Sequence, residues 1–243
     1  MQLKGLDAVS TAQIVSIIIS IAAFLVAAYG IIERRMTATR SERIRLTTIV
    51  ENLTQVRRSL TELAQQGQTS GGMVEVVNTR LEVLSQQALS LVQQHSLTVT
   101  STECREIAFD LELTGYKEDA DFMWGLAQER AKKEGDIQEL YASRGYAYFL
   151  FRSDRATEAR VILQEALSSY PNETDAQRLV KVETLKSWEI WEIEVEGSGA
   201  QMVTSLNEQL EELGHGFSTP RGKAMFASSV GSINRESIGR PQP

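Results

Sequence analysis

The sequence predicts an all-α protein in three parts: an N-terminal transmembrane helix, a pair of heptad-patterned helices, and helical hairpins packed side by side. Three observations lead to this prediction. No charged residue occurs from position 8 to 32, apolar residues recur three and four apart from 46 to 91, and alanines recur at an offset of 39 between 108 and 166. Apolar recurrence at three and four residues is typical of amphipathic helices. Residues 193–196 alternate in a way that could form a short strand.

Residues 1–32 are the predicted membrane anchor, with a span of about residues 12–32. A helix of about 20 apolar residues crosses the hydrocarbon core, and it pairs its own backbone polar groups. The alternative is a cleaved signal peptide, because residues 26–28 are small. The weak charge before the run and the arginines after it favour an anchor. The residues that mark the span are Ala12, Ile19, Phe24 and Ile32.

A group of five arginines follows the apolar run, while only Lys4 and the amino terminus precede it. Basic residues remain preferentially on the cytoplasmic side of a membrane, so the C-terminal domain is predicted to be cytoplasmic. The arginines that set this topology are Arg34, Arg35, Arg40, Arg43 and Arg45.

Residues 33–100 form the predicted juxtamembrane heptad helices, with a glycine break at 67–72. An antiparallel hairpin that turns at the break is favoured, because three glycines are poor helix interior. The unbroken heptad phase also fits a parallel homo-oligomer, and a third arrangement lays two amphipathic helices on the following domain. The heptad residues are Leu46, Ile49, Leu53, Val56, Leu60 and Leu63, then Val74, Val77, Leu81, Leu84, Ala88 and Leu91.

Residues 101–213 read as helix pairs with small residues at the crossings. Turns are predicted at 114–116, 153–155 and 197–199. Small residues allow two helices to cross closely, and neighbouring hairpins bury the apolar face that each leaves open. A compact helical bundle is the alternative to such a stack. The residues predicted to pack at the crossings are Ala108, Ala120, Ala127, Ala147, Ala159 and Ala166.

The spacing of these alanines, with Pro171 after the second pair, resembles the tetratricopeptide repeat over residues 103–171 and weakly over 172–213. This resemblance implies a stack of α-hairpins whose concave face binds peptides or helices. The layout is similar to that of anchored tetratricopeptide scaffolds in bacterial inner membranes and in organelle outer membranes, and the bacterial inner membrane is the expected location.

The amino-acid composition limits the kinds of partner and of binding site that this protein can have. Residues 101–213 hold twelve Lys and Arg against twenty-four Asp and Glu, a charge that disfavours nucleic acid and suits a basic or neutral protein partner. Cys104 is the only cysteine and two histidines stand far apart, so no metal, cofactor or catalytic site is predicted. Trp188 and Trp191 are expected to pack in the domain, and the tail 214–243 is expected to be disordered.

The function that these patterns predict is that of a membrane-anchored adaptor or scaffold that binds proteins through its helical domain. The alternative is a structural or oligomerising envelope protein that acts through its coiled coil. No enzymatic activity is predicted.

Overall fold

A computed structural model describes the backbone of residues 4–67, 71–95 and 99–231, and the side chains of most of these residues from Phe24 onward and of Ser16. The predicted all-α class is confirmed over this part of the chain, which forms helices and their connections without strands. The helices are α1 Lys4–Gln65, α2 Gly71–His95, α3 Ser101–Leu113, α4 Lys117–Glu134, α5 Asp136–Arg152, α6 Ala156–Ser169, α7 Asp175–Glu196, α8 Gln201–His215 and α9 Pro220–Gly231.

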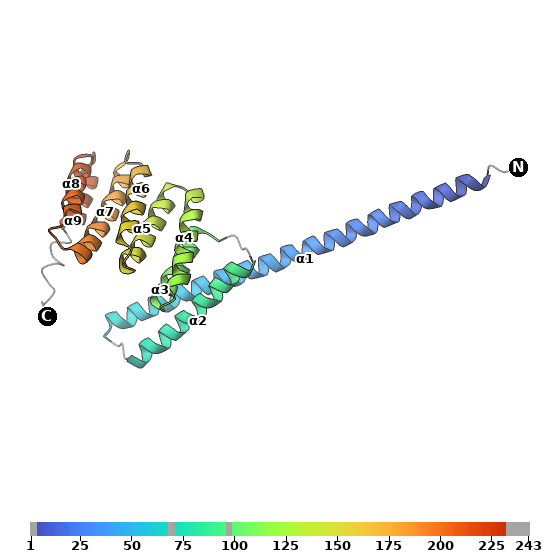
Figure 1. The fold of residues 1–243 in the computed structure, drawn as a ribbon, viewed down its shortest axis with the longest axis horizontal. Helices are drawn as coiled ribbons and strands as arrows, with labels where there is room; N and C mark the ends of the chain where they lie inside the picture. Colours follow the sequence, from blue (N-terminus) through green and yellow to red (C-terminus); the bar gives the residue numbers. More distant parts are fainter. Residues whose placement is uncertain (1–3, 68–70, 96–98, 232–243) are drawn as a thin grey trace.

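Helix α1 is a rod of 62 residues, and α2 folds back along its C-terminal half as an antiparallel hairpin (Figure 1). Gly67 at the turn has φ +65°, a left-handed conformation that glycine adopts without steric cost. The inward heptad side chains Leu46, Leu53, Leu81 and Ala88 are at most 1 % exposed. The heptad pattern therefore builds the inside of one hairpin within a single chain.

The predicted span gains no structural support. Within the part of the chain that the structure describes, none of the helices is long and apolar enough to cross a membrane. The side chains of Ala12, Ile19 and Ile32 lie outside that part, whereas Phe24 is described and 72 % exposed.

Helices α3 to α8 form three successive hairpins, each packed on the next (Figure 1). Their turns lie at 114–116 and 153–155, as predicted, and at 197–200, one residue longer than the predicted 197–199. The six alanines predicted to pack at crossings are all buried, with Ala166 the most exposed at 4 %. The first helix of the second hairpin, α5, contacts both α3 and α7, so the three first helices share one side of the stack. Residues 193–196, the short strand considered above, instead form the last turn of α7.

The predicted disorder of the tail is wrong for residues 214–231. Helix α9 lies against α7, and Phe217 in the connection from α8 is 2 % exposed and packs on Phe226, with ring centroids 5.2 Å apart. A Cβ at Gly214 would lie 2.6 Å from the Phe226 ring. Glycine is needed here for close packing. Flexible segments are also rich in glycine, so composition alone does not distinguish the two cases. Residues 232–243 lie outside the described part.

The α1–α2 hairpin docks on α3 through an apolar core and a rim of polar contacts. Arg43 pairs with Glu103 at 2.7 Å, and the Tyr116 hydroxyl donates to Glu82 at 2.5 Å. Glu103 also completes the capping box of α3 with Thr100, so a single carboxylate holds the helix start and the neighbouring rod together. The rod and the stack are thus one packed unit over this region.

Candidate functional site

The first helices of the hairpins line a groove with a cavity of about 340 Å³. Helices α3, α5 and α7 supply most of its wall, α4 contributes one tryptophan, and α1 closes one end with an arginine. The lining residues are Arg57, Arg105, Glu106, Phe109, Trp124, Tyr141, Arg144, Gly145, Tyr148 and Trp191.

Two arginines share one aromatic ring at the centre of this groove. The guanidinium carbons of Arg105 and Arg144 lie 5.8 and 5.1 Å from the centroid of the Tyr141 ring. Burial and the neighbouring Arg144 lower the pKa of Arg105. Arg144 has a carboxylate in Glu183 at 3.9 Å. Among the described residues no carboxylate lies within 4 Å of Arg105, and the more distant Glu134 only partly offsets the lowering of its pKa. The pair is therefore a concentration of positive charge held by ring stacking.

Arg57 belongs to α1 and brings a third guanidinium to the groove. It pairs with Glu106 and lies 5.3 Å from the Phe109 ring centroid. Its Nε lies 3.3 Å from Asp110, a carboxylate with no exposed surface and no hydrogen bond to either side-chain oxygen. Burial raises the pKa of Asp110 to about 6 despite the attraction of Arg57. The rod helix is thus bound into one end of the groove by a partly satisfied ionic cluster.

The other end of the groove is aromatic. The ring centroids of Tyr148 and Trp191 lie 5.2 Å apart, and those of Phe151 and Trp191 lie 5.8 Å apart. Trp124 lines the floor, where its buried indole N–H has no hydrogen-bond partner. A Cβ at Gly145 would come within 2.5 Å of this ring, so only glycine allows the tryptophan to lie against α5.

The groove is a local exception to the charge of the domain around it. Its lining holds three arginines and one glutamate, a balance of +2, whereas residues 101–213 carry twelve positive and twenty-four negative side chains. Charged and aromatic groups gathered in a recess can bind an extended segment of another protein and select for the charge of that segment.

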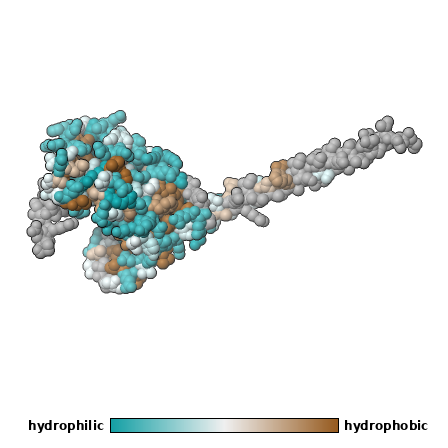
Figure 2. All heavy atoms as spheres, in the orientation of Figure 1, coloured by the Kyte–Doolittle hydropathy of each residue, from teal (hydrophilic) through white to brown (hydrophobic). Residues whose placement is uncertain are grey.

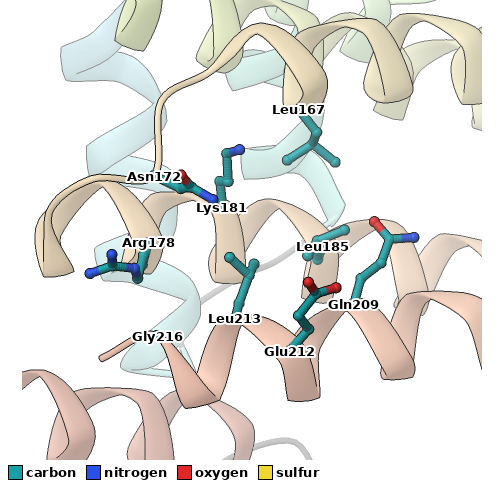
Figure 3. A pocket seen from close by; sticks show the side chains of 9 residues that line it. All are labelled: Leu167, Asn172, Arg178, Lys181, Leu185, Gln209, Glu212, Leu213 and Gly216. Carbon is teal, nitrogen blue, oxygen red and sulfur yellow. The ribbon is translucent and has the colours of Figure 1, made fainter. Parts of the chain in front are cut away.

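A second hollow of about 340 Å³ lies between α7, α8 and the end of α6. Figure 3 shows Lys181 and Asn172 approaching from α7 and its preceding loop, with Gln209 and Glu212 on α8. Its charges are mixed, because Arg178 is paired with Asp175 at 3.2 Å and Glu212 faces the same space as Lys181. The groove on the first helices has the more uniform charge and is the stronger candidate.

Most of the residues that the sequence analysis singled out do not line the groove. The six alanines are buried inside the hairpins and do not line it. Of the five arginines assigned to topology, Arg40 is exposed, Arg43 binds Glu103, Arg45 approaches Glu42 at 4.0 Å, and the side chains of Arg34 and Arg35 lie outside the described part. Cys104 is buried, and burial raises the pKa of its thiol to about 12, which suits a packing role.

The sequence analysis assigned Trp191 to packing and did not identify the groove, although a signal for it exists. The offset of 39 that relates Ala108 to Ala147 also relates Arg105 to Arg144 and Phe109 to Tyr148. Equivalent positions on stacked first helices face the same side. The repeat therefore carries an arginine and an aromatic residue into the groove twice.

Comparison with known proteins adds no relative: no family model, no curated protein and no solved structure matches this chain.

Proposed function

We propose that this protein is a membrane-tethered adaptor that binds a segment of a partner protein in the groove formed by α3, α5 and α7. The observation that carries this proposal is the groove itself, in which ten residues from five helices gather arginine and aromatic side chains. Aromatic and arginine side chains are the residue types most often found at the energetic centres of protein interfaces. The tetratricopeptide-like spacing agrees with this use, since such stacks bind peptides on their concave face.

The tether is proposed from residues 12–32, with the C-terminal domain in the cytoplasm and a bacterial inner membrane as the location. The uncharged sequence run is its main support. Among the described side chains of this part of the rod, Phe24, Leu25 and Tyr29 are 61–72 % exposed and would be available to contact lipid. Figure 2 shows a small hydrophobic patch on the coloured part of the rod, beyond the packed domain.

The alternative, oligomerisation through the heptads, has less support. Leu46, Leu53, Leu81 and Ala88 are already buried within one hairpin, so they are not free to pair with a second chain.

The geometry also favours a different partner charge from the one that composition suggests, because the groove is positive although the domain is acidic. We therefore propose an acidic or neutral segment as the partner in the groove, in place of a basic one.

The tether is tested by carbonate extraction of membranes that contain the full chain. We expect the full-length protein in the pellet and expect Ile19→Asp combined with Phe24→Asp to release it, because two charges in the span cost several kcal/mol. Met36→Asp, beyond the run, is the matched control and should stay in the pellet. Release of the unaltered chain would refute the tether.

The groove is tested by site-specific photocrosslinking in cells, with the crosslinking amino acid at Tyr148 of the full chain. A discrete crosslinked protein is expected from Tyr148 and not from Val161, which is 51 % exposed on α6. The same crosslinked protein should disappear when Trp191→Ala is added. Equal labelling from both positions, or none from Tyr148, would contradict the groove as the binding surface.

A further inference from the structure

The positive charge at the centre of the groove gives information about the chemistry of the ligand. Arg105 and Arg144 are like charges held on one ring, and Arg105 is half-buried with no ion-pair partner among the described residues. Two guanidinium groups that share a desolvated site repel each other, and an anion placed beside both removes that repulsion. Planar guanidinium groups also match the geometry of carboxylates, which accept two parallel N–H bonds.

The surroundings indicate the kind of anion. Arg105 and Arg144 present guanidinium N–H donors at the centre of the groove, and these can donate to ligand oxygens. Tyr148 and Trp191 lie further along the groove and offer a flat apolar surface. A ligand that satisfies both regions therefore carries oxygen acceptors next to an apolar or aromatic group.

A nucleic acid fits these observations less well. Its phosphates repeat along the whole strand, and beyond the groove they would meet a domain with twice as many acidic as basic side chains. Glu106 on the rim and Glu183 beside Arg144 also carry negative charge toward the edges of the site. Positive charge is thus confined to the centre, which favours a ligand with one or two carboxylates.

We propose that the groove selects a protein segment in which an aspartate or glutamate stands near an aromatic or large aliphatic residue, with the carboxylate between Arg105 and Arg144 and the apolar side chain on Tyr148 and Trp191. This inference rests on the proposed binding function of the groove and specifies its partner chemically. Tyr141 acts as a positioning residue, because its ring holds both guanidinium groups.

The test measures fluorescence anisotropy of labelled nine-residue peptides with the purified full chain in detergent. The acidic probe contains two glutamates, one phenylalanine and one leucine among glycines and serines, and the control probe has glutamine in place of both glutamates. We expect the acidic probe to bind at least 10-fold more tightly and to weaken as salt is raised. Equal affinity of the two probes would overturn the inference.

Variants of the protein locate the site. Arg105→Gln and Arg144→Gln should each weaken binding of the acidic probe about 10-fold or more. Lys132→Gln, an equal loss of charge at an exposed position on α4, should change affinity less than about 2-fold.

Tyr141→Leu should weaken binding and Tyr141→Phe should restore it, because only the ring is required. Equal effects of the three charge-removing changes would mean that net charge alone drives binding and would overturn the inference, as would tighter binding of a single-stranded oligonucleotide than of the acidic probe.

The two proposals can fail separately. If Tyr148 crosslinks a protein in cells but the acidic and control probes bind alike, the groove is a docking surface and its carboxylate selectivity is refuted. If the acidic probe binds in an arginine-dependent way but no protein is crosslinked, the site chemistry stands and the adaptor function fails.

Discussion

The second and third hairpins of the stack bury their contact faces with different side chains. In α5/α6 the crossing is made by Ala147 and Ala159, both fully buried. In α7/α8 the buried side chains are larger, among them Leu185 on α7 and Leu206 on α8, and the two helices contact each other less extensively. Small residues allow close helix contact, whereas large side chains keep the axes apart and fill the space between them.

Two buried carboxylates, those of Glu192 and Asp110, differ in the number of hydrogen bonds that they accept. Glu192 on α7 has no exposed surface and accepts three hydrogen bonds, two from Arg160 on α6 at 2.6 and 2.8 Å and one from the Trp188 indole at 2.7 Å. Asp110 on α3 is equally buried but has no hydrogen bond to its side-chain oxygens. Glu192 is thus satisfied by an arginine of the neighbouring hairpin and by a tryptophan of its own helix, whereas Asp110 has only the ion pair with Arg57 of α1.

The largest expected effect follows from removing the partner of Glu192. Arg160→Ala should lower the free energy of unfolding by about 3–5 kcal/mol, since a buried carboxylate would keep only the indole donor. Urea unfolding measures the change, with Lys133→Ala as the control, because Lys133 pairs with Glu129 on the exposed face of α4. If both variants unfold at the same urea concentration, Glu192 does not depend on Arg160.

Enlarging a small crossing residue tests the second hairpin. Ala159→Leu should cost about 1–3 kcal/mol, because a fully buried position between close helices has no room for three more carbons. Gln164→Leu on the exposed face of the same helix should stay within about 0.5 kcal/mol. Similar melting temperatures for the two variants would show that α5 and α6 are not closely packed at Ala159.

The contrast between the carboxylates predicts a pH dependence for Asp110. Its pKa is raised in the folded state, so folding is favoured by the protonated form, and this stabilisation is lost as the pH rises through about 6. Asp110→Asn lacks the titration, so relative to wild type it should gain about 1 kcal/mol in stability between pH 5 and pH 8. Unfolding of both proteins at the two pH values measures this difference. A difference that does not vary with pH would contradict the assignment.

The smallest effect is expected from a matched pair of glycines. Gly145→Ala must displace the Trp124 ring, whereas Gly125 has open space around its Cβ position and both glycines lie inside helices. Alanine is favoured over glycine in a helix by about 0.5–1 kcal/mol, so Gly125→Ala should stabilise the protein slightly. Gly145→Ala should do the opposite and should change the tryptophan fluorescence. Stabilisation by both changes would mean that Trp124 is free to move.

The helical elements and their turns could be predicted because each depends on local pattern. The heptads around Leu53 and Leu81, and the alanine spacing around Ala159, describe faces of single helices. The groove depends instead on which helices become neighbours, and Trp191 reaches Tyr148 through packing that no local pattern encodes. Helix α9 was missed for the same reason, because its order depends on Phe217 and on Asp175, which accepts hydrogen bonds from Ser218 and Thr219 at the start of that helix.

The continuous rod also sets how far from a membrane the groove would stand. Arg57 follows Ile32 by 25 residues of uninterrupted helix, a rise of roughly 38 Å at 1.5 Å per residue. A partner anchored in the same membrane would need a linker of at least about 11 fully extended residues between its own span and the segment that enters the groove. If residues 12–32 span a membrane and the rod stands upright on it, partners with shorter linkers would be excluded by reach alone, whatever their affinity. The length of α1 would then act as a filter on which neighbouring proteins can be bound.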